Sequence, residues 1–143
     1  MFRLMPFIGI VMAIYAAFAL LGAVFGDADF DMATFLGNEV WRITLPSKKD
    51  WPLNIGELFV LGGLVALGIE SLKAAGTTRT SMGNHILSML SFIGGLLLFI
   101  LVAGFETSPF FLLVAKAGID TMAGMLVSIV TAKRDVGVDR AEM

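Results

Sequence analysis

Residues 110–130 read FFLLVAKAGIDTMAGMLVSIV, and this stretch decides the fold class. An α-helix rises about 1.5 Å per residue, so about 20 apolar residues cross the hydrocarbon core of a bilayer. The stretch has this length, yet it contains a cation and an anion, Lys116 and Asp120. The sequence therefore predicts a membrane-spanning helix with two charged side chains inside it.

The whole chain has the composition of an integral membrane protein. Of its 143 residues 57% are hydrophobic, and its mean hydropathy is +0.88. Soluble domains are only about 45–50% apolar. Three further apolar runs of suitable length occupy residues 5–25, 53–72 and 86–105. We expect an all-α integral membrane protein, a single domain built as a four-transmembrane-helix bundle.

The connections between the runs predict the orientation of the chain. Residues 26–52 form the only long loop, residues 73–85 a short polar loop, and residues 131–143 a polar tail. Lysine and arginine are enriched in cytoplasmic segments. Nine of these residues lie outside the apolar runs: Arg3, Lys73, Arg79, Lys133, Arg134 and Arg140 on the side of the termini, and Arg42, Lys48 and Lys49 on the other. We therefore expect both termini to be cytoplasmic (N-in/C-in), in a bacterial inner membrane.

The two charges of 110–130 lie on one face of the predicted helix. At 100° per residue, Lys116 and Asp120 share a face with small and polar residues such as Ala117 and Gly124. The bulky residues Ile119, Met122, Met125, Leu126 and Ile129 lie on the other face. We expect the small and polar face to look into the bundle and the bulky face to contact lipid.

A second acidic residue lies at a similar depth. Lys116 is about 9 Å and Asp120 about 15 Å below Phe110, and Glu57 is about 9 Å below Trp51, with Asn54 one turn above it. An unpaired charge at mid-membrane costs at least about 2.5–3.5 kcal/mol. The sequence predicts an intramembrane charge network of Glu57, Lys116, Asp120 and Asn54, which serves either as a structural contact or as a proton path.

Small residues recur at helical spacing in the first three runs. They are Gly9, Ala13 and Ala17 in the first, Gly62 and Ala66 in the second, and Ser88, Ser91 and Gly95 in the third. Because lipid gives helices no hydrophobic drive to associate, such residues favour close helix packing. The same residues would also serve contacts with other subunits.

The loop 26–52 begins with alternating carboxylates. Asp27, Asp29 and Asp31, with Glu39 further on, follow the spacing that opens a calcium-binding EF-hand loop. Methionine stands at the position of the sharp-turn glycine, and Glu39 comes one residue late, so a true EF-hand is excluded. Two interpretations stay open: a looser calcium site over these four residues, or a solvated acidic cap on the first helix. Asp31 is also predicted to cap a short helix over 32–36 that Gly37 ends.

The second half of this loop alternates apolar and polar side chains. Trp41, Ile43 and Leu45 are separated by Arg42 and Thr44, a pattern typical of an extended segment with one apolar face. We expect this segment to pack on the membrane surface or on a partner. Trp41 and Trp51 are predicted to anchor the chain at the membrane interface.

Other polar residues point to simpler roles. His85, the single histidine, begins the third run, where it either caps a helix or binds a pigment or haem. Glu70 and Lys73 are predicted to form a surface pair. The chain has no cysteine, no nucleophile–base pair and no basic cluster. We therefore expect no catalysis, no metal or other cofactor apart from the calcium alternative, and no nucleic-acid partner.

These features favour a non-catalytic accessory, anchoring or assembly subunit of a larger membrane complex. Its partners would be lipids of the bilayer and other membrane-protein subunits, or further copies of the same chain. The alternative is an oligomeric channel or a proton-coupled transporter, whose path would use Glu57, Lys116 and Asp120.

Overall fold

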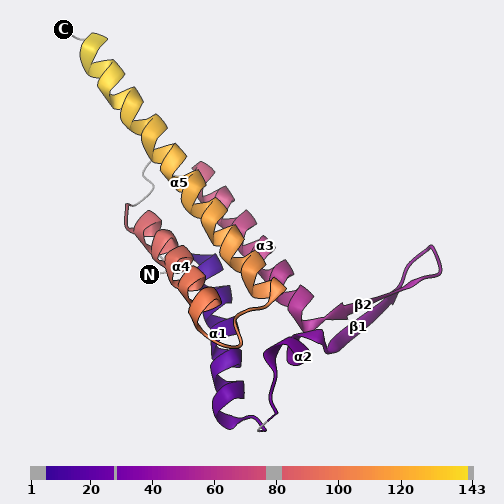
Figure 1. Cartoon of the computed structure of the whole chain (residues 1–143). Helices are drawn as coiled ribbons and strands as arrows, with labels where there is room; N and C mark the ends of the chain where they lie inside the picture. The colour runs from indigo at the N-terminus through magenta and orange to yellow at the C-terminus, as the bar shows by residue number, and fades with distance from the viewer. Residues whose placement is uncertain (1–5, 28, 77–81, 142–143) are drawn as a thin grey trace.

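The computed structural model describes the backbone of residues 6–27, 29–76 and 82–141, and the side chains of 6–27, 29–72, 86–126 and 129 (Figure 1). Within these ranges the chain is mostly helical. Its elements are α1 (Phe7–Phe25), α2 (Met32–Gly37), β1 (Glu39–Thr44), β2 (Asp50–Asn54), α3 (Ile55–Gly76), α4 (Met82–Leu101) and α5 (Ser108–Ala141).

Three of the described helices are long and apolar enough to cross a membrane. These segments are Phe7–Phe25, Ile55–Leu72 and Ser108–Leu126, and a shorter apolar segment, Ile86–Leu101, lies in α4. By length and composition they indicate an integral membrane protein, as the sequence predicts.

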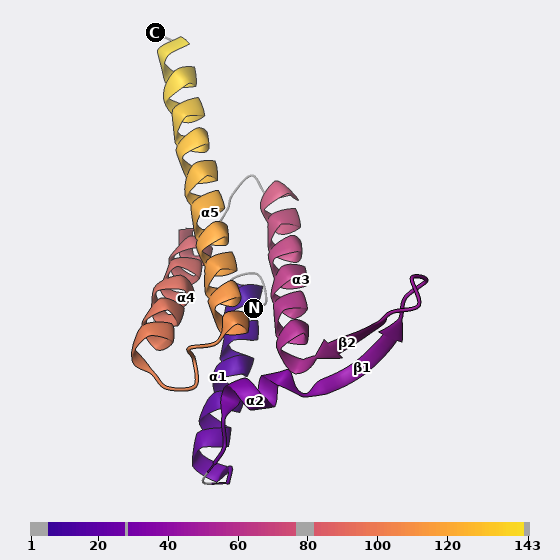
Figure 2. The ribbon, with the colours of Figure 1, turned by 45° about the vertical axis from the view of Figure 1, so that its right-hand side comes forward.

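Helix α5 contacts each of the other three long helices, and α1 also packs against α3 and α4. Helices α4 and α5 run antiparallel, as the short turn between them predicts (Figures 1 and 2). Helix α5 continues beyond its neighbours to Ala141. Most of the predicted tail 131–143 is therefore a helical extension of α5.

The third predicted run is shifted along the chain. Helix α4 ends at Leu101, because the following residues turn back: Gly104 has φ +88°, a conformation that glycine adopts without steric cost. The Phe105 N–H donates to the Val102 carbonyl at 3.3 Å, and the Phe105 side chain is only 1% exposed. The sequence predicts Phe105 within the third span, whereas it lies in the turn after α4 and its ring is buried in the core.

An aromatic cluster around Tyr15 joins α1 to the start of α5. The Tyr15 ring lies 4.7 Å from Phe110, 5.2 Å from Phe59 and 5.9 Å from Phe105, between ring centroids. The Tyr15 hydroxyl is 2.5 Å from the Thr107 hydroxyl, and Thr107 accepts in turn from the Phe110 N–H at 3.4 Å. Thr107 thus caps α5 and holds the buried phenol at once.

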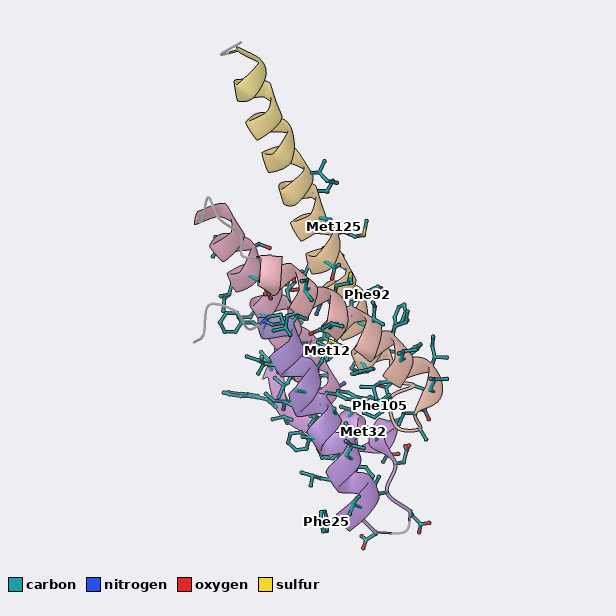
Figure 3. All side chains as sticks on the ribbon, turned by 90° about the vertical axis from the view of Figure 1, so that its left-hand side faces the viewer. Met12, Phe25, Met32, Phe92, Phe105 and Met125 are labelled. Atoms are coloured by element: carbon teal, nitrogen blue, oxygen red, sulfur yellow. The ribbon has the colours of Figure 1, made fainter. Side chains whose placement is uncertain are left out.

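The predicted faces of α5 are confirmed by its burial. Phe110, Leu113, Val114 and Ala117 are fully or almost fully buried. The bulky residues that were predicted to contact lipid are all more than half exposed, namely Ile119, Met122, Met125, Leu126 and Ile129. In Figure 3, Met125 extends away from the helices, whereas Met12 lies among them. The helical period alone separates the two faces.

The loop after α1 contains a short helix and two β-strands, whereas the sequence predicts an all-α fold. Asp31 caps α2 as predicted, by accepting from the Thr34 N–H at 2.8 Å. The extended segment around Trp41 is strand β1, which pairs antiparallel with β2 into a two-stranded hairpin. The sequence had assigned residues 53 and 54 to the span. Pro52 argues against a strand, but proline is tolerated at the sheet edge that a two-stranded hairpin offers.

Glycines allow the long helices to approach closely. A Cβ atom on Gly95 would collide with Met12 Cε and lie 3.1 Å from Val114 Cγ2. Three predicted small-residue positions, Ala66, Ser88 and Gly95, are buried, whereas Ala13 and Ala17 are exposed. Helices in lipid associate mainly through such close packing of their backbones.

We expect Gly95→Leu to destabilise the protein by about 1–3 kcal/mol, since it overpacks the contact with Met12 and Val114. Gly94→Leu is the matched control, because a Cβ there meets nothing within 4 Å. Thermal unfolding in detergent measures both. Equal loss of stability in the two variants would contradict the close helix contact at Gly95.

Candidate functional site

Glu57 and Asn54 form the start of α3 rather than part of a charge network. The Glu57 N–H donates to Asn54 Oδ1 at 2.9 Å, and the Asn54 N–H donates to Glu57 Oε2 at 3.0 Å. This reciprocal pair is a capping box, which satisfies two backbone donors that a helix start leaves open. The sequence carried this signal, since an N-cap residue followed three positions later by Glu predicts a helix N-terminus.

Lys116 holds α5 against α3. Its ammonium donates to the carbonyl of Val60, across the two helices. Gly63 lets α5 approach α3 beside this contact, because a Cβ there would collide with Leu113 Cδ2. Lys116 therefore faces the neighbouring helix, as predicted, but its partner is a backbone carbonyl.

Asp120 is partly buried one turn further along α5. Among the described residues, no hydrogen bond or ion pair joins Asp120 to Lys116 or to Glu57. The single ion pair of the described side chains is Arg42–Glu39, on the hairpin. The prediction that two acids share the Lys116 cation is therefore wrong for Glu57 and Asp120 in this structure. The Val60 carbonyl accepts from Lys116, and the capping box with Asn54 engages Glu57, so neither residue needs a carboxylate–ammonium contact.

Glu70 is a buried carboxylate that the sequence placed in a surface pair with Lys73. It is only 4% exposed, and its Oε2 accepts from the Phe7 N–H at 3.1 Å. That N–H belongs to the first turn of α1, whose own N-cap, Pro6, offers no side-chain bond. A carboxylate at a helix N-terminus is favoured by the helix dipole. Glu70 therefore joins the end of α3 to the beginning of α1; the side chain of Lys73 lies outside the described residues.

Tyr15 is a second buried polar residue whose role the sequence did not predict. Its hydroxyl satisfies the cap of α5, as described above. The available signal was a single tyrosine among the apolar residues of the first run, because a buried phenol needs a hydrogen-bond partner.

Two of the four predicted calcium ligands, Asp31 and Glu39, form other bonds. Asp31 caps α2, and the Thr34 hydroxyl and N–H hold the pKa of its carboxyl below the ordinary value. The Arg42 guanidinium donates to both oxygens of Glu39, at 2.7 and 2.6 Å, and lowers the pKa of that carboxyl likewise. Within the described residues, no three acidic or histidine side chains are grouped to hold a metal ion. The loose site over Asp27, Asp29, Asp31 and Glu39 is thus not formed in this structure.

Two predictions concern aromatic residues near the helix ends. Trp41 and Trp51 lie on the hairpin and are 68% and 46% exposed. Their role as interface anchors stays a prediction. His85 lies in α4, and its side chain falls outside the described part, so its role as a pigment or haem ligand stays untested.

Comparison with protein-family models, with curated proteins and with solved structures found no match for this chain. The candidate site is therefore defined by geometry alone. It includes four side chains with hydrogen bonds to neighbouring segments: Glu57, Glu70, Lys116 and Tyr15. It also includes Asp120, which lies one helical turn after Lys116 on α5.

The capping box predicts that Glu57 acts as an acceptor and not as a charge. Glu57→Gln keeps an oxygen that accepts from the Asn54 N–H, so we expect stability close to that of the wild type. Glu57→Ala removes the acceptor and should lower the free energy of unfolding by about 1 kcal/mol. Chemical or thermal unfolding in detergent measures the difference.

A Lys116→Met variant supplies the control. If Glu57 and Lys116 act separately, the effects of Glu57→Gln and Lys116→Met add within about 0.5 kcal/mol. If Glu57→Gln were as unstable as Glu57→Ala, or if the effects of Glu57→Gln and Lys116→Met on the free energy of unfolding were far from additive, the predicted charge network would be supported instead.

Proposed function

We propose that the chain is a four-helix transmembrane bundle of α1, α3, α4 and α5, in a bacterial inner membrane with both termini cytoplasmic. In this proposal it catalyses no reaction. It serves as an accessory, anchoring or assembly subunit of a larger membrane complex.

The proposal rests mainly on one observation: polar side chains in the helices form hydrogen bonds to backbone groups of the chain itself. Glu57, Glu70 and Lys116 each bond to a backbone group: Glu57 at the cap of α3, Glu70 at the first turn of α1, and Lys116 at a carbonyl of α3. The bonds of Glu70 and Lys116 join different helices and fix them relative to one another, whereas that of Glu57 fixes the start of α3. This favours a rigid structural unit over a relay that must change its partners.

The outer faces of the helices also support the proposal. In each of the three long spans, 22% of the residues are buried within the chain. The exposed faces are covered by lipid or by helices of other subunits. Between α1 and α4 lies an open groove of about 200 Å³, lined mainly by Gly9, Met12, Ala13, Ala16, Leu90, Ser91, Gly94, Gly95 and Leu98. Small residues along such a groove would let a helix of another subunit approach closely.

A proton-coupled transporter or channel is the second candidate. Asp120 favours it, because this carboxylate lies about 18 Å along α5 from Ser108 and has no hydrogen bond or ion pair among the described residues. Ionisable groups at such depth are common in proton paths.

We expect the protein to co-purify with a discrete set of membrane subunits after mild detergent extraction, and Gly94→Leu to release them by filling the groove. Gly68→Leu is the matched control, since a Cβ there also meets nothing within 4 Å but lies on α3, away from the groove. Extraction as a pure homo-oligomer, unchanged by Gly94→Leu, would argue against an accessory subunit.

The second candidate is tested with Asp120→Asn in proteoliposomes. For an accessory subunit, we expect wild type and variant to show the same proton leak, measured with an entrapped pH-sensitive dye. A proton-dependent flux that Asp120→Asn abolishes, while its thermal stability is kept, would replace the accessory function by transport.

A further inference from the structure

The hairpin of β1 and β2 has one apolar and one polar face. Residues directly opposite each other on paired strands share a face. Trp41 pairs with Leu53 and Ile43 with Trp51, so these four apolar side chains lie together. Arg42, Thr44 and Asp50 lie on the other face, where Arg42 is paired with Glu39 and the Thr44 hydroxyl donates to Asp50 at 2.8 Å.

The apolar face is exposed to the surroundings. Trp41 is 68%, Trp51 46% and Ile43 42% exposed. Figures 1 and 2 show why: the hairpin stands clear of the long helices and runs across the direction of α3. Two exposed indole rings beside aliphatic side chains favour association with an apolar surface.

The root of the hairpin is fixed at the start of a candidate membrane span. Asn54 is the last residue of β2 and the cap of α3, so no linker separates them. The Ile55 N–H also donates to the Asn38 carbonyl at 3.1 Å, directly before β1. Both strands therefore leave from the first turn of α3, at the level where that helix would enter the bilayer.

The tip of the hairpin carries positive charge. Residues 45–49 form the turn, in which the Leu45 N–H donates to the Lys49 carbonyl at 2.9 Å and the Lys48 N–H to the Leu45 carbonyl at 2.8 Å. Lys48 and Lys49 are exposed at this tip. Their ammonium groups complement the phosphates of anionic lipids.

We propose that the hairpin lies in the headgroup region of the bilayer at the start of α3, with its Trp41–Trp51 face toward the acyl chains and Lys48 and Lys49 on lipid phosphates. Lipid is favoured over a protein partner because the root is held at membrane level, the indoles match the membrane interface, and the tip charge matches anionic headgroups. This lipid-binding surface is separate from the groove between α1 and α4, so it stands independently of the accessory function.

The chain offers a direct probe, because its two tryptophans both lie on this face. The full chain is reconstituted into phosphatidylcholine–phosphatidylglycerol vesicles that contain phosphatidylcholine brominated either near the glycerol or near the methyl end of its acyl chains. We expect the bromines near the glycerol to quench the tryptophan emission strongly, the distal bromines to quench it less, and aqueous iodide to quench it little.

Trp41→Phe and Trp51→Phe leave one indole each, and both single variants should show the same depth. Strong quenching by iodide without quenching by bromolipid would overturn the proposal and point to a surface for a soluble partner. Protection from both quenchers would overturn it in favour of a protein–protein contact.

The lysines are tested with the double variant Lys48→Gln, Lys49→Gln. In wild type, the bromolipid quenching should be stronger in vesicles with phosphatidylglycerol than in pure phosphatidylcholine, and the double variant should lose this difference. A difference that persists in the double variant would remove the lysine contacts from the proposal.

Discussion

A polar group that enters an apolar helical protein must find its hydrogen bond within the protein, because neither lipid nor a packed core supplies one. The structure meets this requirement by placing its polar side chains where backbone groups are left open. Glu70 accepts from the first turn of α1, Glu57 closes the start of α3, and Lys116 donates to a carbonyl of α3. The Tyr15 hydroxyl likewise meets the cap of α5. Three of these four contacts join segments far apart in the sequence, so the same bonds that satisfy polar groups also fix the arrangement of the helices.

Close packing around these bonds depends on residues without bulk. Leu113 fits against α3 because Gly63 has no side chain, and Met12 and Val114 fit against α4 because Gly95 has none. Dispersion contacts of this kind accumulate only at short distance. The hydrophobic effect contributes little between surfaces that lipid would otherwise cover, so shape and hydrogen bonding decide which helices meet.

The functional proposals follow from this division of roles. Among the described side chains, Glu57, Glu70, Lys116 and Tyr15 bond within the chain. The exposed surfaces there include apolar helix faces, the groove between α1 and α4, and the hairpin with its two indoles. Such surfaces suit contacts with lipids and with other subunits. Asp120 is the exception, since the described residues offer it no bond, and it is the residue that keeps transport as a candidate.

The sequence by itself determined the membrane class, the positions of the four apolar runs within a few residues, the cap of α2 and the two faces of α5. All of these depend on local composition or on the helical period, which a single segment carries. The spacing of Asn54 and Glu57 also predicts a capping box. The similar depths of Glu57 and Lys116 in their predicted spans favoured a distant partner for Glu57 instead. Only the tertiary structure decided that Lys116 meets a carbonyl, that Glu70 reaches α1, that Phe105 returns to the core and that residues 50–54 pair with 39–44. Depth along a helix gives one coordinate, whereas a hydrogen-bond partner is chosen by rotation, tilt and neighbouring segments, which packing alone fixes.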